Sequence, residues 1–152
     1  MRTAEQVRYL ILAAQREGNR LLMTLLSELV LTPAQSEALR IIADHGPLAL
    51  RDLGGMLVCD SGTSPSRLVD RLVAAGLVTR DGSTHDRRQI QLKVTPSGKE
   101  KADRVRAIEE RIYESIDSTL DADDTEALLG ALRALTQDSA ARGAFEKRLA
   151  AE

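Results

Sequence analysis

The middle third of the sequence concentrates hydroxyl and guanidinium groups that could recognise a nucleic acid. Arginine pairs bidentately with guanine, and a serine hydroxyl bonds either a base edge or a phosphate. An arginine on a narrow projecting loop can also enter the minor groove, where the negative potential is concentrated. The candidate DNA-binding residues are Thr63, Ser64, Ser66, Arg67, Arg71, Asp86, Arg87 and Arg88.

Asp86 is the one acidic member of this set, so it needs a different role. Its carboxylate could hold the guanidinium of Arg88, or that of Arg71, in a fixed pose through a bidentate contact. Both pairings stay open from the sequence. Residues 86–88 could also form no more than a solvated, charged turn.

Charge is unevenly distributed along the chain, although the formal net charge is only −2. Residues 62–93 carry six basic and three acidic side chains, whereas residues 104–152 carry seven and eleven. A basic patch on an acidic protein can bind nucleic acid at one face while its other surfaces repel phosphates. Aromatic residues make up 2% of the chain, too few for a single-strand stacking platform, so a duplex is the expected partner.

Catalytic and metal-binding patterns are not indicated. The two histidines, His45 and His85, lie on different predicted elements, and no metal-ligand spacing accompanies them. Residues 61–64 lack the lysine of a phosphate-binding loop, and no nucleophile–base pair stands out. We therefore expect a protein that is not an enzyme and that holds neither a cofactor nor a metal.

The cellular setting is predicted from a single cysteine and from the apolar runs. Cys59 alone cannot form a disulfide within the chain, which fits a reducing compartment. No signal peptide opens the sequence, and no apolar run approaches the roughly 18 residues of a membrane span. These features predict a soluble, cytoplasmic protein without membrane contact.

Apolar periodicity and capping residues divide the chain into predicted elements. Thr32, Pro33 and Gln35 form a capping box, and we expect Gly46 to end the helix that follows in the left-handed conformation. Alternating residues over 77–80 and 89–95 predict a β-hairpin with a charged tip. The predicted helices cover residues 3–29, 33–45, 51–57, 65–75, a long segment that Thr95 caps and a last segment that Asp121 caps.

A short helix, a turn, a second helix and a hairpin follow one another in the order of a winged helix-turn-helix. In that arrangement the second helix enters the major groove and the hairpin reaches along the backbone. We predict a mainly α (α+β) fold in one domain over residues 1–152. Residues 32–98 would form the winged part, and long N- and C-terminal helices over 1–31 and 99–152 would form the dimerisation part.

Three stretches carry a family resemblance: LTPAQ at 31–35, LVAAGLV at 72–78 and DRRQIQLKVTPSG at 86–98. They are similar to the MarR family of bacterial transcriptional regulators, and the resemblance covers nearly the whole chain. It implies a homodimer joined by the terminal helices, bound to a pseudo-palindromic DNA operator, with repression relieved by a small-molecule effector. It also implies recognition-helix positions for Ser64, Ser66 and Arg67, a minor-groove position for Arg88 and an orienting role for Asp86.

The resemblance has a bearing on Cys59 as well. The peroxide-sensing branch of the family keeps its reactive cysteine in the first helix, where this chain has none. Cys59 lies in the helix-turn-helix region, and a lone cysteine among apolar neighbours is more often an inert packing residue than a sensor. The family's effector cleft lies between the dimer helices and the winged domain, and the sequence identifies no ligand for it.

A second hypothesis is a winged-helix module that binds only protein, without sequence-specific DNA binding. The two long amphipathic terminal segments bury little apolar surface alone, so they require a partner. A second copy of the chain would supply it under the first hypothesis, and another protein under the second. Convergence of Arg67, Arg71 and Arg88 on one surface favours DNA. We therefore predict a regulator, acting as a repressor, that binds duplex DNA as a homodimer.

Overall fold

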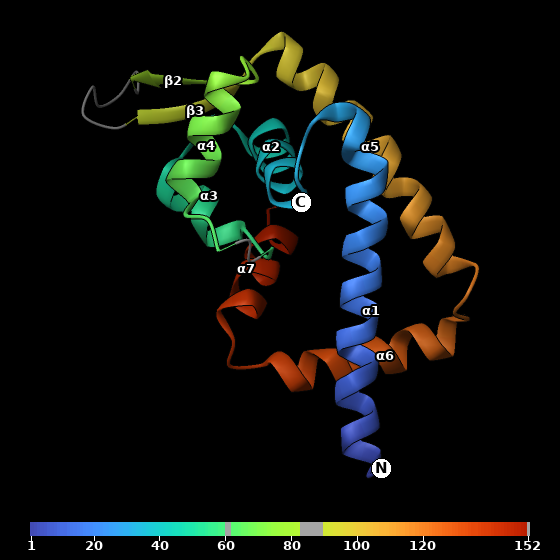
Figure 1. The fold of residues 1–152 in the computed structure, drawn as a ribbon. Coiled ribbons are helices and arrows are strands. Elements are labelled where there is room, and N and C mark those ends of the chain that lie inside the picture. The colour runs from blue at the N-terminus through green and yellow to red at the C-terminus, as the bar shows by residue number, and fades with distance from the viewer. Residues whose placement is uncertain (60–61, 83–89, 152) are drawn as a thin grey trace.

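Helices dominate the computed structural model, which describes residues 1–59, 62–82 and 90–151. Figure 1 shows α2, α3, α4 and the small sheet gathered together, with α5 leading away from the sheet towards α6. None of the helices in these ranges is long and apolar enough to cross a membrane. The elements are α1 (Thr3–Leu26), η1 (Ser27–Leu29), α2 (Pro33–His45), β1 (Leu48–Ala49), α3 (Leu50–Met56), α4 (Pro65–Ala74), β2 (Val78–Gly82), β3 (Ile90–Val94), α5 (Pro96–Asp117), α6 (Ala122–Thr136) and α7 (Ala140–Leu149).

Polar side chains cap the first amides of the helices at the predicted positions Thr32, Thr95 and Asp121. In α2 the Thr32 hydroxyl accepts a hydrogen bond from the Gln35 amide at 3.2 Å, and the Gln35 side chain accepts one from the Thr32 amide at 2.9 Å. This is the reciprocal capping box. The Thr95 and Asp121 side chains each accept one hydrogen bond from the third amide of α5 and α6, which confirms both predicted starts.

Two helix ends differ from the sequence-based prediction. The first helix is α-helical only to Leu26, continues as the 3-10 turn η1 and closes at Val30, which has φ 55°. Gly46 is extended, with φ −71°, so the predicted left-handed end of α2 is wrong. A Cβ at position 46 would lie 2.4 Å from the carbonyl oxygen of Ile42, so glycine is needed here for close approach.

The three strands form one antiparallel sheet in the order β1-β3-β2. Leu48 pairs with Leu92 across β1 and β3, and Val78 pairs with Val94 across β2 and β3. The β2–β3 ladder confirms the predicted hairpin. Its tip, residues 83–89, lies outside the described residues.

The hydrophobic core lies among α2, α3, α4, the sheet and the first turns of α5. In α4 the apolar side chains Leu68, Val69 and Leu72 are buried, which turns the opposite side of that helix outward. Core side chains with at most 2% exposure include Leu39, Ile42, Leu53, Leu72, Leu77, Leu92 and Val105.

The start of α5 is locked onto the hairpin. The Thr95 hydroxyl donates to the Gly76 carbonyl at 2.7 Å and accepts from the Gly98 amide at 2.9 Å. A Cβ on residue 98 would lie 1.9 Å from the Leu77 carbonyl oxygen. This junction therefore requires glycine, which explains the last residue of the DRRQIQLKVTPSG stretch.

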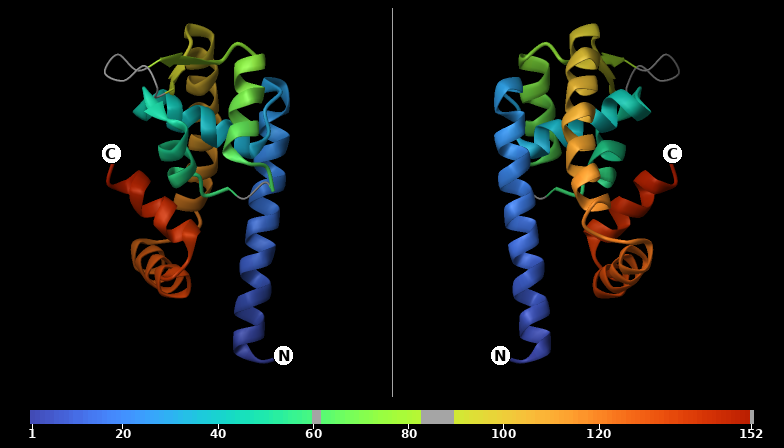
Figure 2. Two further views of the ribbon diagram at one scale, coloured as in Figure 1. Left: turned by 90° about the vertical axis from the view of Figure 1, so that its left-hand side faces the viewer. Right: turned by 90° about the vertical axis from the view of Figure 1, so that its right-hand side faces the viewer.

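The terminal helices bury far less than the winged part. Leu26 is the one buried residue of α1, and α6 has none. In Figure 2 the N-terminal turns of α1 extend past the rest of the chain.

The last helix, α7, was not predicted as a separate element. The chain breaks after α6, and the Ser139 hydroxyl accepts from the Arg142 amide at 3.1 Å to cap the new helix. α7 then packs against α3 of the same chain (Figure 1).

Candidate nucleic-acid interface

The outer side of α4 carries four of the predicted DNA-binding residues. Ser64 is the N-cap of this helix, and its hydroxyl accepts from the Arg67 amide at 3.4 Å. Thr63, just before it, is half-buried. We call the exposed set the recognition face, made of Ser64, Ser66, Arg67 and Arg71.

The acidic residue on the same helix is engaged by the hairpin. Asp70 lies one residue before Arg71, and its carboxylate pairs with the Arg80 guanidinium of β2 at 2.7 Å. Arg67 and Arg71 form no salt bridge with any residue in the described ranges. Their guanidinium groups therefore face solvent while the nearby negative charge is balanced.

Sequence reasoning missed Arg80, although a signal was present. Arg80 occupies an exposed position of the predicted strand, and Asp70 an outer position of the helix before it. The Asp70–Arg80 pair joins α4 to β2. A second ion pair, Lys93 with Asp81 at 3.3 Å, joins the neighbouring strands β3 and β2. The hairpin and the recognition face are thus held together by charge as well as by the core.

The wing residues Asp86, Arg87 and Arg88 lie outside the described residues. The two pairings considered for Asp86 therefore stay predictions, as do the minor-groove roles of the two arginines. Of the three arginines expected to converge, the structure places Arg67 and Arg71 on one face of α4.

A glycine pair sets how α3 approaches its two neighbours. A Cβ on Gly54 would lie 3.3 Å from Cγ of Pro65, the first residue of α4. A Cβ on Gly55 would lie 3.0 Å from Nζ of Lys147 on α7. Glycine is a poor helix former, but here the absence of side chains allows close packing on two sides of a short helix.

Cys59 stands in the connection between α3 and α4. Part of the residue is exposed, but burial of the thiol, reinforced by the neighbouring Glu37 carboxylate, raises the pKa of Cys59 to about 11. The thiol is therefore protonated at neutral pH, and a protonated thiol is a poor nucleophile.

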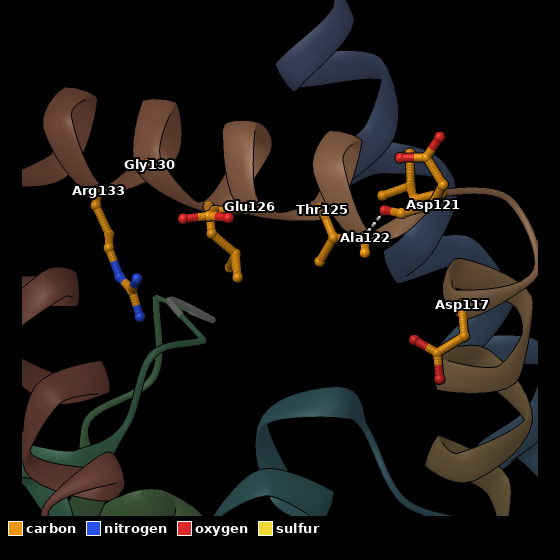
Figure 3. Close-up of a pocket in the computed structure, with 9 residues that line it drawn as sticks. Asp117, Asp121, Ala122, Thr125, Glu126, Gly130 and Arg133 are labelled. Carbon is orange, nitrogen blue, oxygen red and sulfur yellow. Dashed lines mark hydrogen bonds between the residues drawn. The ribbon is translucent and has the colours of Figure 1, made fainter.

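A recess of about 590 Å³ lies between the end of α5 and α6 (Figure 3). Asp117 and Asp121 stand at one end and Arg133 at the other, with Glu126 between them. Three carboxylates against one guanidinium make the recess unsuited to phosphate. Across the described ranges, no three His, Cys, Asp or Glu side chains gather as a metal-binding group would require.

Comparisons with known proteins agree with this geometry. The family model for the MarR family matches residues 31–90. The chain is 33% identical over 105 residues to the organic hydroperoxide resistance transcriptional regulator of Bacillus subtilis, covering 67% of this chain and 71% of that protein. It is 31% identical over 108 residues to the HTH-type transcriptional regulator FarR of Neisseria gonorrhoeae, covering 70% and 66%.

A solved structure extends the comparison to a DNA complex. A cysteine-to-serine mutant of MarR from E. coli, complexed with operator DNA, matches with a TM-score of 0.73 and 27% sequence identity. The match covers 86% of this chain and 93% of that one. The winged helix-turn-helix predicted from the order of the elements is thus confirmed.

Proposed function

Because this chain belongs to the MarR family of transcriptional regulators, we propose that it represses transcription as a homodimer bound to duplex DNA. In this proposal α4 of each copy enters the major groove of a pseudo-palindromic operator, and each wing reaches the adjacent minor groove. The observation that carries the proposal is the recognition face, with two exposed arginines free of salt bridges in the described ranges. A DNA-bound regulator would work in the cytoplasm.

The recognition face offers two kinds of contact. Arg67 and Arg71 are four residues apart on one helix face, so both guanidiniums can address the same groove. A guanidinium that reaches guanine donates two parallel hydrogen bonds to its edge. The Ser64 hydroxyl and the N-terminal end of α4 suit a phosphate oxygen, since the helix dipole favours an anion there.

The wing supplies the second contact in this proposal. Arg87 and Arg88 would follow the backbone and enter the minor groove, and Asp86 would orient one arginine. The Asp70–Arg80 pair supports this geometry because it ties the strand that leads into the wing to the helix that reads the major groove.

The homodimer is proposed from the unburied terminal helices. A helix without fully buried residues, such as α6, gains little stability from packing within the chain, and isolated helices of this length are marginal in water. Large apolar side chains are left exposed on both α1 and α6. They are Val7, Leu10, Ile11, Leu12 and Leu21 on α1, and Leu128, Leu129, Leu132 and Leu135 on α6.

Charge complementarity makes a second copy the fitting partner. α1 and the two residues before it carry four arginines and two glutamates, whereas the recess beside α6 is lined by three carboxylates and one guanidinium. An exposed, basic and apolar helix of one copy would suit the acidic and apolar side of another. Such a contact is self-complementary, as a two-fold symmetric dimer requires.

Regulation in this proposal acts through the spacing of the two recognition helices. Half-sites lie about one helical turn apart, so a small change in spacing lowers operator affinity. The B. subtilis relative is named for organic hydroperoxide resistance, but α1 of this chain has no cysteine and the Cys59 thiol is protonated at neutral pH. We therefore propose an effector that acts without oxidising a cysteine.

The central experiment is selection of genomic DNA fragments by the purified protein, followed by a salt titration of the best fragment. A palindromic fragment whose log affinity falls linearly with log salt supports the proposal. If Arg71 reads a base, Arg71→Ala should weaken binding by about 1–3 kcal/mol. If Arg71 contacts a phosphate, the slope of log affinity against log salt should fall in magnitude by about 1.

The matched control is Arg111→Ala, which removes the same charge from the second half of α5, where the helix leads away from α4 (Figure 1). It should leave the affinity unchanged. Recovery of no fragment above background at low salt, from a folded dimer, would instead favour the protein-binding module.

A further inference from the structure

A buried carboxylate links three distant parts of the chain beside the recognition helix. Among the described residues, Glu37 on α2 is the one charged residue that is buried, with 8% exposure. Its Oε1 accepts from the Val58 amide at 2.9 Å, and its Oε2 accepts from the Cys59 amide at 2.8 Å. Arg148 of α7 donates to the same Oε1 at 3.0 Å.

The two amides belong to the connection that leads from α3 to α4. α3 ends at Met56 and Ser64 caps α4, so a clamp at residues 58 and 59 fixes the chain soon after α3 ends. Two successive amides held by two oxygens of one carboxylate fix the direction of the backbone as well as its position. Gly54 against Pro65 fixes the other side of this connection.

Arg148 supplies the cation that faces the carboxylate of this clamp. A buried carboxylate without a compensating cation is strongly unfavourable, and removal of one partner of such a pair leaves the other charge uncompensated. The Arg148 guanidinium comes from the last turn of α7, which otherwise buries only Ala144 within the chain. The seating of α7 on α3 and the pairing of the Glu37 carboxylate with Arg148 therefore depend on each other.

We propose that Glu37 and Arg148 are positioning residues for the DNA-reading helix: Glu37 fixes the α3–α4 connection on α2, and α7 holds that clamp through Arg148. The inference rests on the proposed DNA-binding function. It assigns α7 a role in setting the position of α4 relative to the rest of the chain. Loosening of α7 would release the connection and misplace the recognition face without removing any group that touches DNA.

The test compares Arg148→Ala, Arg148→Lys and a matched control, Arg142→Ala. Arg142 lies on the same helix and carries the same charge, but its salt bridge is with Glu146 within α7. The first measurement is hydrogen exchange at the Val58 and Cys59 amides in the free, folded protein. Arg148→Ala should speed exchange of both amides by about tenfold, Arg148→Lys by less, and Arg142→Ala should leave it unchanged.

The second measurement compares affinity for the selected fragment with affinity for an unrelated duplex of equal length. Arg148→Ala should weaken binding to the selected fragment by about five- to tenfold. The affinity for the unrelated duplex should change by less than about twofold, because nonspecific binding depends mainly on phosphate contacts. Arg148→Lys should restore most of the affinity. Equal losses on both duplexes would overturn the positioning role.

The two measurements separate this inference from the proposed function. Unchanged exchange at both amides in folded Arg148→Ala would overturn the clamp, whatever the DNA result. If the unaltered protein binds no DNA while the exchange result holds, the DNA-positioning role is overturned together with the proposed function, and the link between α7 and the α3–α4 connection stands.

Discussion

The winged part and the terminal helices use apolar side chains in opposite ways. Leu39, Leu53 and Leu92 of the winged part are at most 1% exposed, whereas Leu10 of α1 is 69% exposed and Leu135 of α6 is 64% exposed. The first region completes its core within one chain. The second leaves two apolar helices without a matching surface, which is the pattern of an obligate interface before its partner is present.

The difference shows that the two regions constrain the sequence in different ways. Close packing in the winged part fixes individual residues, down to glycines that no other residue could replace. The open helices require only an apolar face and a fitting charge. Substitutions of equal size should therefore act on stability in the first region and on assembly in the second.

Gly98→Ala should have the largest effect on stability. The added Cβ would lie 1.9 Å from the Leu77 carbonyl oxygen, so the start of α5 must shift away from the sheet. We expect the free energy of unfolding to fall by about 3 kcal/mol or more, measured by denaturant titration.

The control is Gly130→Ala in α6, where no atom lies within 4 Å of the added Cβ. Alanine is the better helix former, so this variant should gain up to about 1 kcal/mol. A comparable loss at both positions would show that α6 is as closely packed as the winged part, and the contrast between the regions would fail.

Leu10→Glu should act on assembly and leave the fold of the single chain intact. Burial of one leucine contributes about 1.5–3 kcal/mol, so replacing it with a charge should raise the dimer dissociation constant by about 100-fold. Sedimentation at several concentrations measures this, and circular dichroism should show unchanged helix content. Ile90→Glu on β3, at a residue 58% exposed, is the matched control and should remain dimeric.

The sequence allowed more of the winged part to be predicted than of the terminal segments. Capping at Thr32 and Thr95 is local chemistry, and local chemistry placed the starts of those two helices correctly. The conformation of Gly46 was predicted wrongly. Glycine is needed at this position because a Cβ would clash with the Ile42 carbonyl oxygen one turn earlier, a contact that the sequence does not show.

The ion pairs between elements were also not predicted, although the sequence contains a sign of one of them. Glu37 lies on the inward face of α2 with Ala34, Ala38 and Ile41, so a charge interrupts an apolar stripe. That pattern predicts a buried partner without identifying it. Arg148 could not be assigned, because it lies 111 positions away on a helix that was not predicted.

The Cys59 amide and Arg148 of α7 both bind the Glu37 carboxylate. Cys59 is therefore a probe for the place where α7 packs against the winged part. With the pKa raised to about 11, alkylation of Cys59 at pH 7.5 should be about 100-fold slower than in urea, where the thiol titrates near its ordinary value. The rate should keep rising with pH towards 11. Since the folded state holds the thiol proton more tightly, the stability that this proton contributes is present below about pH 9 and lost as pH rises towards 11.

Glu37→Gln should lower the pKa of Cys59 part of the way from about 11 towards its ordinary value, because burial, the first cause, stays in place while the effect of the carboxylate is removed. Glu146→Gln on α7 is the control and should leave the pH profile unchanged. If folded Cys59 instead titrates near 9, neither burial nor Glu37 acts on the thiol. The connection after α3 would then be held less closely to α2 than the two amide contacts of Glu37 require.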